Sequence, residues 1–250
     1  MLIEMTNNDK SWILKNHSGL TITDKVRPVS IKGTLAFDMF YDKENKQFFL
    51  NPKEDYDPPE YRIRDEYQIE IILERGKFSD LPQVREIGGR IDRVRKIKGF
   101  AHPKDMHVGE NGNVCLCPKQ AEFRILSNGF NMQDFVCGLV IPFFYGQSFY
   151  ARNGSWPFGE YQHGTLGLLE YYRNSRSDID KDLIKDTINS LKIYNMLWDF
   201  SFKPFLQVEG AGWNGFCPCE SKRDFQECHP EFFWILWLLK QDIKKSGVSV

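Results

Sequence analysis

The stretch YRIRDEYQIEIIL, residues 61–73, places apolar side chains at alternate positions, which is the period of a β-strand with one buried face. Three further runs have a similar β-rich composition: GTLAFDMFYD (33–42), KQFFLNP (46–52) and PQVREIGGRI (82–91). Asn, Asp, Pro and Gly residues separate the runs, as they do in turns between neighbouring strands. Residues 31–97 are therefore predicted to form an antiparallel β-meander.

The pattern changes to helix from about residue 131. In MQDFVCGLVIPFFYGQSFYARNG (132–154) and GTLGLLEYYRN (164–174), apolar residues recur every three or four positions. The uncharged run 135–151 is too short and too polar to span a membrane, so we expect a buried helix that is broken or kinked near Pro142. A block of strands followed by helices predicts an α+β fold.

The polar stretch NSRSDIDKDL, residues 174–183, is a candidate linker. It predicts a boundary near Arg176, and Ser177 or Asp178 is expected to cap the helix that follows. The predicted organisation has three parts: an N-terminal segment 1–29, a main domain 30–175, and a helical C-terminal region 176–250.

Composition limits the kinds of partner that the protein can bind and the cell compartment in which it is expected. The chain has 250 residues, a net charge of −1 and six cysteines, and its first residues lack the continuous apolar core of a secretory signal. We expect a cytoplasmic protein, in which cysteines are more often catalytic or metal-bound than paired. Basic residues are concentrated only in GGRIDRVRKIKG (88–99), which is interpreted as a solvated edge strand, so neither a nucleic-acid nor a membrane partner is predicted.

The stretch CPCESKRDFQECH, residues 217–229, has the ligand count and type of a closed tetrahedral zinc site. The expected ligands are Cys217, Cys219, Cys228 and His229. The stretch resembles the SEC-C motif, a small zinc module at the ends of many bacterial proteins, although Glu220 and Lys222 stand where that motif usually has glycines. The resemblance implies a structural zinc and a docking or stabilising role without a reaction of its own.

A second cysteine-containing stretch is HVGENGNVCLC, residues 107–117. Cys115 follows a turn signal, Asn111-Gly112-Asn113, and a thiol at an exposed turn can be reached by a large partner. Cys137 instead lies within an apolar helical run and is expected to pack in the core as a small apolar side chain.

Three motifs in order carry a further resemblance: LPQVRE (81–86), HVGENGNVCL (107–116) and GSWPFGEYQHG (154–164). Together they resemble the prokaryotic branch of the ubiquitin-conjugating enzymes over about residues 30–175. The resemblance implies the fold of that family and makes Cys115 the thioester-forming nucleophile. It also makes His107, which leads the turn, a candidate catalytic residue.

The chain departs from the eukaryotic relatives, which carry His-Pro-Asn before the cysteine with the asparagine stabilising the oxyanion. Here the sequence is His107-Val108-Gly109, and Asn111 and Asn113 either substitute for that asparagine or only form the turn. The tripeptide 102–104 imitates the His-Pro start, but it begins 13 residues before the cysteine and is interpreted as a loop. His163 either assists as a base or orienting group, or is a structural hydrogen-bonding residue.

The first functional hypothesis is a conjugating enzyme that carries the C-terminal glycine of a donor protein on Cys115 and passes it to a target lysine. The resemblance implies an ATP-dependent activating enzyme and a ubiquitin-like or nucleotidyltransferase donor as partners, in antiphage defence or protein modification. Two alternatives stay open. One is a non-catalytic, zinc-stabilised adaptor with the same fold, and the other is a cysteine hydrolase, for which the sequence shows no base-orienting carboxylate pattern.

Overall fold

The computed structural model describes residues 2–53, 61–76, 79–127, 129–177, 179–194, 197–219 and 221–250. The chain forms two compact units. The first comprises Met1–Cys117 and Asn128–Glu160, and the second comprises Pro118–Ser127 and Tyr161–Val250. The fold class expected from the sequence, an antiparallel sheet with helices, is confirmed.

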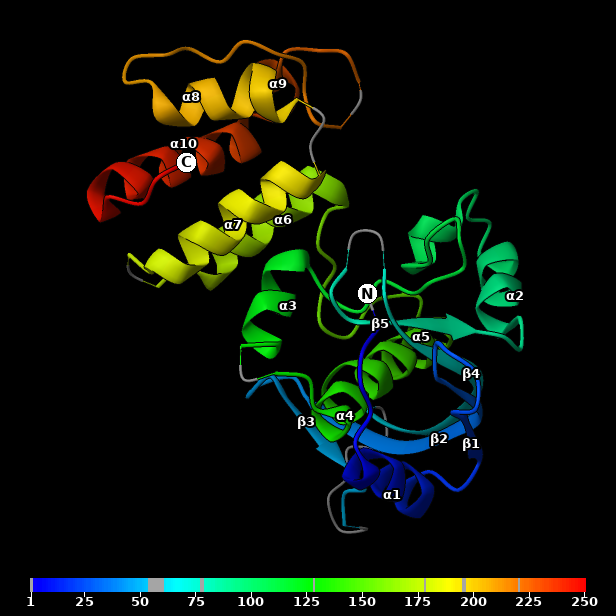
Figure 1. The fold of residues 1–250 in the computed structure, drawn as a ribbon. Coiled ribbons are helices and arrows are strands. Elements are labelled where there is room, and N and C mark those ends of the chain that lie inside the picture. The colour runs from blue at the N-terminus through cyan, green and yellow to red at the C-terminus, as the bar shows by residue number, and fades with distance from the viewer. Residues whose placement is uncertain are drawn as a thin grey trace. The chain divides into compact units, whose positions relative to one another are not determined.

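The first unit is built on an antiparallel sheet (Figure 1). Its strands are β1(Leu20–Thr23), β2(Ser30–Asp42), β3(Gln47–Leu50), β4(Arg62–Arg75) and β5(Pro82–Glu86). The order is β1-β2-β4-β5, and β3 pairs with the far end of β2. The sheet is therefore not a simple meander, because the long β4 pairs with the similarly long β2 instead of with the short β3 that precedes it.

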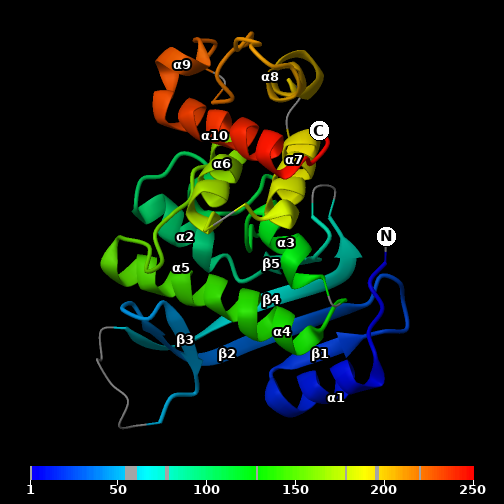
Figure 2. The ribbon, with the colours of Figure 1, turned by 90° about the vertical axis from the view of Figure 1, so that its left-hand side faces the viewer.

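Alternation along the strands buries one face of the sheet. In β4 the side chains of Ile63, Tyr67, Ile69 and Ile71 are buried, whereas those between them are partly or fully exposed. The buried face is covered by α4(Met132–Phe135), the π-helical turn η2(Val136–Val140) and α5(Ile141–Asn153), which run along the sheet (Figure 2). The Tyr67 hydroxyl lies 3.1 Å from Ser148 Oγ of α5 and ties the two layers together.

The helix expected over 132–154 is confirmed, with its interruption next to Pro142. Pro142 lies in the first turn of α5, directly after η2, whose Ile141 N–H donates to Val136 O; because proline has no N–H, the regular ladder of helical bonds is interrupted at this position. Within the described residues, no helix has both the length and the apolar character needed to cross a membrane. Cys137 lies in η2 and is half-buried, and burial raises the pKa of its thiol.

The basic run 88–99 is a helix, so the interpretation as an edge strand was wrong. Strand β5 ends at Glu86, and α2(Arg90–Ile97) follows after Gly89, whose φ of 68° lies in the left-handed region that glycine adopts without strain. Asp92 pairs with Arg95 and Lys96 three and four residues later, which is the spacing that stabilises a helix and not a strand.

Residues 1–29, expected as a separate N-terminal segment, belong to the first unit. Helix α1(Asn7–Asn16) begins with a capping box formed by Thr6 and Asp9, and β1 then pairs with β2. Gly33 of β2 allows a close approach there, because an added Cβ would lie 2.2 Å from the backbone oxygen of Gly19.

The second unit is helical. Its elements are α3(Lys119–Ile125), α6(Gly164–Ser175), α7(Lys181–Tyr194), η3(Trp198–Phe202), α8(Lys203–Gln207), α9(Phe225–Cys228) and α10(Pro230–Ser246). Apolar side chains of α6 to α10 form one buried cluster. The polar stretch near Arg176 lies between α6 and α7, inside this unit. At the start of α7, the side chain of Asp180 accepts hydrogen bonds from the N–H groups of Asp182 and Leu183. This is the capping role that was expected for Ser177 or Asp178. Asp178 lies outside the described residues.

Candidate functional site

Cys115 lies at the end of a narrow hairpin formed by residues 107–115 of the first unit. Its N–H donates to the carbonyl of His107 at 2.8 Å, and Val108 pairs with Val114 in antiparallel fashion. The hairpin closes where the N–H of Gly109 donates to Asn113 O at 2.8 Å. The turn predicted before Cys115 is therefore present.

One strand of the hairpin extends the sheet beyond β5. The Val114 N–H donates to Val84 O at 2.8 Å, and Asn113 pairs with Arg85. The side chain of Asn113 strengthens the pairing, because its Oδ1 accepts from Arg85 Nε at 2.8 Å while its Nδ2 donates to Gln83 Oε1 at 2.9 Å. The residue two positions before the thiol is therefore tied to the sheet.

The Cys115 thiol is exposed and 3.9 Å from the carbonyl of Cys117, towards which it donates. Cys117 is half-buried, so the two neighbouring thiols differ in access. An exposed thiol on a hairpin held against a sheet is accessible and has a defined position.

His107 provides an imidazole in the same hairpin. Its backbone has φ 54°, and its ring packs edge-on against Trp156 with the centroids 4.8 Å apart. Its Nε2 lies 3.5 Å from Glu160 Oε1. The segment GSWPFGEYQHG therefore places a carboxylate, that of Glu160, next to the imidazole of His107, the residue paired with Cys115. No local pattern in the sequence reveals this combination.

The remaining candidates lie in two different places. Asn111 is exposed at the hairpin tip, where its Oδ1 accepts the N–H of Asn113 at 3.1 Å and stabilises the turn. His163 is exposed and occupies the N-cap position of α6, in the second compact unit. The structure thus brings His107, Asn111, Asn113 and Cys115 into one hairpin, whereas His163 belongs to another part of the chain.

The second candidate site is the Cys/His cluster of the second unit. One ligand atom from each of four residues lies within 4.8 Å of the others, and these residues are Cys217, Cys219, Cys228 and His229. Cys217 Sγ is 3.1 Å from His229 Nδ1, and Cys219 Sγ is 3.6 Å from Cys228 Sγ. With Zn–S bonds of about 2.3 Å, the ligand atoms of a tetrahedral zinc site lie somewhat less than about 4 Å apart. The geometry fits a metal ion of this size.

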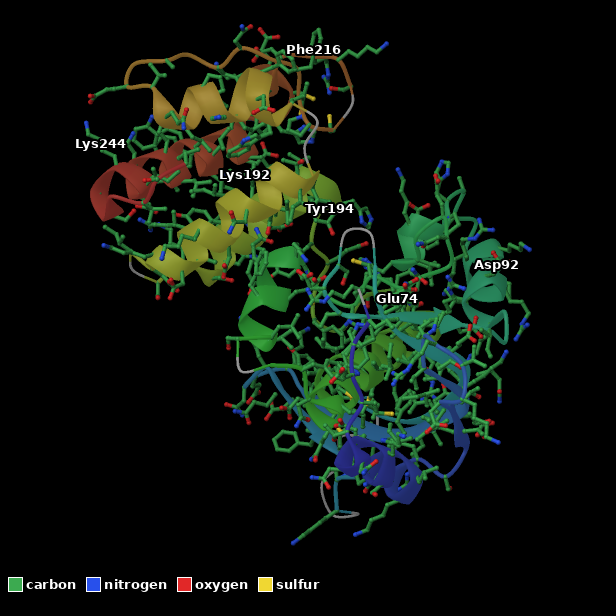
Figure 3. All side chains as sticks on the ribbon, viewed as in Figure 1. Glu74, Asp92, Lys192, Tyr194, Phe216 and Lys244 are labelled. Atoms are coloured by element: carbon green, nitrogen blue, oxygen red, sulfur yellow. The ribbon has the colours of Figure 1, made fainter. Side chains whose placement is uncertain are left out.

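A tight loop and a helix start hold the cluster together. The Cys217 N–H donates to Arg223 O at 2.7 Å and closes the loop, and Asp224 caps α9 by accepting from Gln226 N at 2.7 Å. Phe225 of α9 is fully buried against Trp213, with ring centroids 5.3 Å apart. Phe216, just before the loop, is exposed (Figure 3). The Cys/His cluster therefore lies at the periphery of the apolar core of the second unit.

The thiols of the cluster have unequal proton affinities. Burial raises the pKa of Cys217 to about 12. Burial acts in the same direction on Cys219, but hydrogen bonds, first from Ser221, lower its pKa to about 6. Ser221 Oγ also lies 3.1 Å from Cys228 Sγ. A bound divalent cation would favour the thiolate at each position.

Comparison with protein-family models, curated proteins and solved structures found no match for this chain.

Proposed function

We propose that the chain is a conjugating enzyme of the ubiquitin-conjugating type, with Cys115 as the acyl carrier. The observation that carries the proposal is the exposed thiol on a hairpin whose backbone and Asn113 side chain are tied to strand β5. A carrier has to present its thiol to two successive large partners, first the activating enzyme and then the target. A thiol at a projecting but fixed turn meets both requirements.

The proposed reaction has two balanced steps. The Cys115 thiolate attacks the thioester carbonyl that links the donor's C-terminal glycine to the activating enzyme, and the activating enzyme leaves as its thiolate. A target lysine amine then attacks the new thioester, forms an isopeptide bond and releases the Cys115 thiolate, while the surplus proton of the amine passes to a base. His107, oriented by Glu160, is the base that we propose for this step.

For the Cys/His cluster we propose one structural Zn²⁺. Three thiolates and one imidazole form a closed ligand set with no position for substrate, as structural zinc sites do. The ion would join the loop 217–223 to the start of α10. The reaction at Cys115 does not require it in this proposal.

A cysteine hydrolase is the second candidate, and the pairing of His107 with Glu160 favours it. The two activities differ in the fate of the acyl group on Cys115. A conjugating enzyme holds the thioester until an amine arrives, whereas a hydrolase gives it to water within one turnover.

One experiment separates these functions. The protein is incubated with its activating enzyme, ATP and donor, the adduct is isolated, and its decay is followed with and without added lysine. We expect a slow decay that lysine accelerates, and His107→Gln should slow the lysine-dependent decay while loading continues. Rapid decay in water alone would support the hydrolase, and the lack of any adduct would support the adaptor. His163→Ala tests the other histidine by the same two rates.

A further inference from the structure

Helix α5 makes one buried hydrogen bond to the chain that leads into the Cys115 hairpin. The side chain of Gln147 is 2% exposed, and its Nε2 donates to the Met106 carbonyl at 2.8 Å. Met106 is itself fully buried and directly precedes His107. Because α5 packs along the sheet, this bond ties the peptide group before His107 to a well-packed part of the first unit.

The bond fixes a peptide group whose orientation is linked to the backbone angle of His107. The φ angle of a residue is the rotation about the bond between its N and Cα, so the preceding peptide plane, which here carries the Met106 carbonyl, turns with it. The φ of His107 is 54°, in the left-handed region, which costs a non-glycine residue free energy. Such a conformation persists only where surrounding contacts hold it, and the Gln147 bond is one of them.

Two further contacts depend on the backbone of His107. Its carbonyl accepts the Cys115 N–H at 2.8 Å, so it sets the position of the residue that carries the thiol. Its ring packs against Trp156, which in turn stacks on Tyr150 with the ring centroids 4.6 Å apart. Tyr150 lies three residues after Gln147 on α5, which places both on the same face of the helix. One face of α5 therefore supports both the backbone and the ring of His107.

Packing does not explain a glutamine at this buried position. The Oε1 of Gln147 is buried and has no hydrogen-bond partner among the described residues. A buried amide oxygen without a protein partner stabilises the fold no better than a methionine side chain of similar size. The bond that the amide donates to Met106 accounts for the glutamine.

We infer that Gln147 is a positioning residue for His107, an inference that rests on the base role proposed for His107 in the lysine step. The bond to Met106 holds the backbone of His107 so that its imidazole stays beside Glu160. Without this bond the backbone of His107 can turn towards negative φ, which moves its carbonyl away from the Cys115 N–H and its ring away from Glu160. Gln147 acts through His107 and touches no reacting atom.

The structural test replaces Gln147 with methionine, which keeps the volume and removes the donor. We expect the Cys115 amide to exchange with solvent at least about fivefold faster, as for the loss of one hydrogen bond, and the NMR signals of the His107 ring to move from the positions set by Trp156. The urea midpoint should change little, since the substitution conserves volume and removes an unpaired oxygen. Gln147→Leu, which also lacks the donor, should reproduce these signals.

Gln120→Met is the matched control. Gln120 is also a fully buried amide that donates to a carbonyl at 2.8 Å, that of Leu168 in the second unit, and its Oε1 also has no partner among the described residues. This variant should leave the Cys115 amide and the His107 ring signals unchanged. Unchanged signals in Gln147→Met, or equal changes in the two variants, would overturn the inference.

The kinetic test uses a probe that needs no partner protein, the acetyl-Gly-Gly thioester of 2-mercaptoethanesulfonate, in a Cys117→Ala background. The Cys115 thiolate displaces the mercaptoethanesulfonate thiolate, and free lysine then attacks the new thioester, forms an amide and releases the Cys115 thiolate, while the surplus proton passes to the base. We expect Gln147→Met to slow the lysine step about tenfold and acylation by less than about twofold. In the His107→Gln background it should have no further effect.

The two tests separate the positioning role from the proposed base and carrier roles. A lysine step that Gln147→Met slows equally with and without His107 would overturn the inference, because the effect would then not act through the imidazole. Altered exchange and NMR signals, with no effect of His107→Gln on the lysine step, keep Gln147 as the anchor of His107 and reject the base role. The same altered signals without acylation of Cys115 keep the anchor and reject the carrier role.

Discussion

The side-chain amide of Asn113 holds the hairpin of Cys115 against strand β5 through both its oxygen and its nitrogen. Arg85 donates to its oxygen and Gln83 accepts from its nitrogen. The amide is thereby engaged in positioning, which favours the turn-forming alternative for this residue over direct contact with an oxyanion.

Replacing Asn113 tests that role. Asn113→Ala leaves the partner groups of Arg85 and Gln83 unpaired, so we expect the free energy of unfolding to fall by about 1–2 kcal/mol. The amide of Val114 should also exchange faster, since its bond to β5 loosens. Urea unfolding and hydrogen exchange measure the two effects. Asn45→Ala, which removes an exposed bond to Asp42, is the matched control and should change stability by less than about 0.5 kcal/mol. Equal losses in the two variants would contradict the positioning role.

At the scale of single residues, the sequence predicts an exposed turn but not its anchors. Asn111-Gly112-Asn113 is a local turn signal, and the structure has a turn there. The partners of Asn113 lie 28 and 30 residues away, and no local pattern specifies which residues of another strand a hairpin will meet. The same holds for Glu160 beside His107.

At the scale of elements, α2 shows why the basic run was misinterpreted. Ile91, Val94 and Ile97 recur every three residues, which is a helical spacing, but only Ile91 is buried and Ile97 is 81% exposed. The apolar pattern was therefore too weak to outweigh the preceding strand-like residues. The helix depends on its charge pairs and on Gly89, both of which are decided locally.

Helices α6 and α10 are joined through the carboxylate of Asp242, which is 1% exposed. It accepts from Tyr172 Oη at 2.6 Å and from Arg176 Nε at 2.6 Å. Burial alone would raise its pKa, but these hydrogen bonds outweigh burial and lower it. Because the folded pKa lies below the unfolded value of about 3.9, the contribution is present above about pH 4 and is lost as the pH falls through the folded pKa.

Asp242→Asn should therefore destabilise the second unit in a pH-dependent manner. We expect a loss of about 2–3 kcal/mol at pH 7 and a smaller difference from the unsubstituted protein as the pH falls below about 4. Urea unfolding of both proteins between pH 7 and 3, prepared with equal metal content, measures this. Glu209→Gln removes an exposed pair with Lys244 and serves as the control, with little change expected. A difference that stays constant with pH would contradict the account.

At the scale of the whole molecule, the chain divides in a way that composition does not reveal. Residues 118–127 belong to the second unit, where the Gln120 side chain donates to the Leu168 carbonyl at 2.8 Å. The four residues of the Cys/His cluster, by contrast, lie within 13 consecutive residues and could be grouped from their spacing alone. A site formed by residues close together in the sequence can be predicted from their spacing, whereas the packing of segments far apart in the sequence cannot.

Loss of the proposed zinc should affect the two units differently. We expect one zinc per chain and its loss in the double variant Cys217→Ala/Cys219→Ala, with exchange protection over 205–245 falling at least about tenfold while β2 and β4 keep theirs. Metal analysis and hydrogen exchange provide the two readouts, and Cys137→Ala is the control that should retain zinc. Equal metal content in the double variant, or uniform loosening of both units, would contradict the assignment.

The identity of the acylated residue tests the central proposal most directly. The measurement is the donor adduct formed with activating enzyme and ATP, separated with and without reductant, in the unsubstituted protein and in variants of Cys115 and Cys117. We predict a reductant-sensitive adduct in the unsubstituted protein and in Cys117→Ala, and no adduct in Cys115→Ala. Cys115→Ser should form an adduct slowly that persists in reductant, because an oxygen ester resists thiol exchange. An adduct that survives Cys115→Ala, or that disappears only in Cys117→Ala, would contradict Cys115 as the acyl carrier.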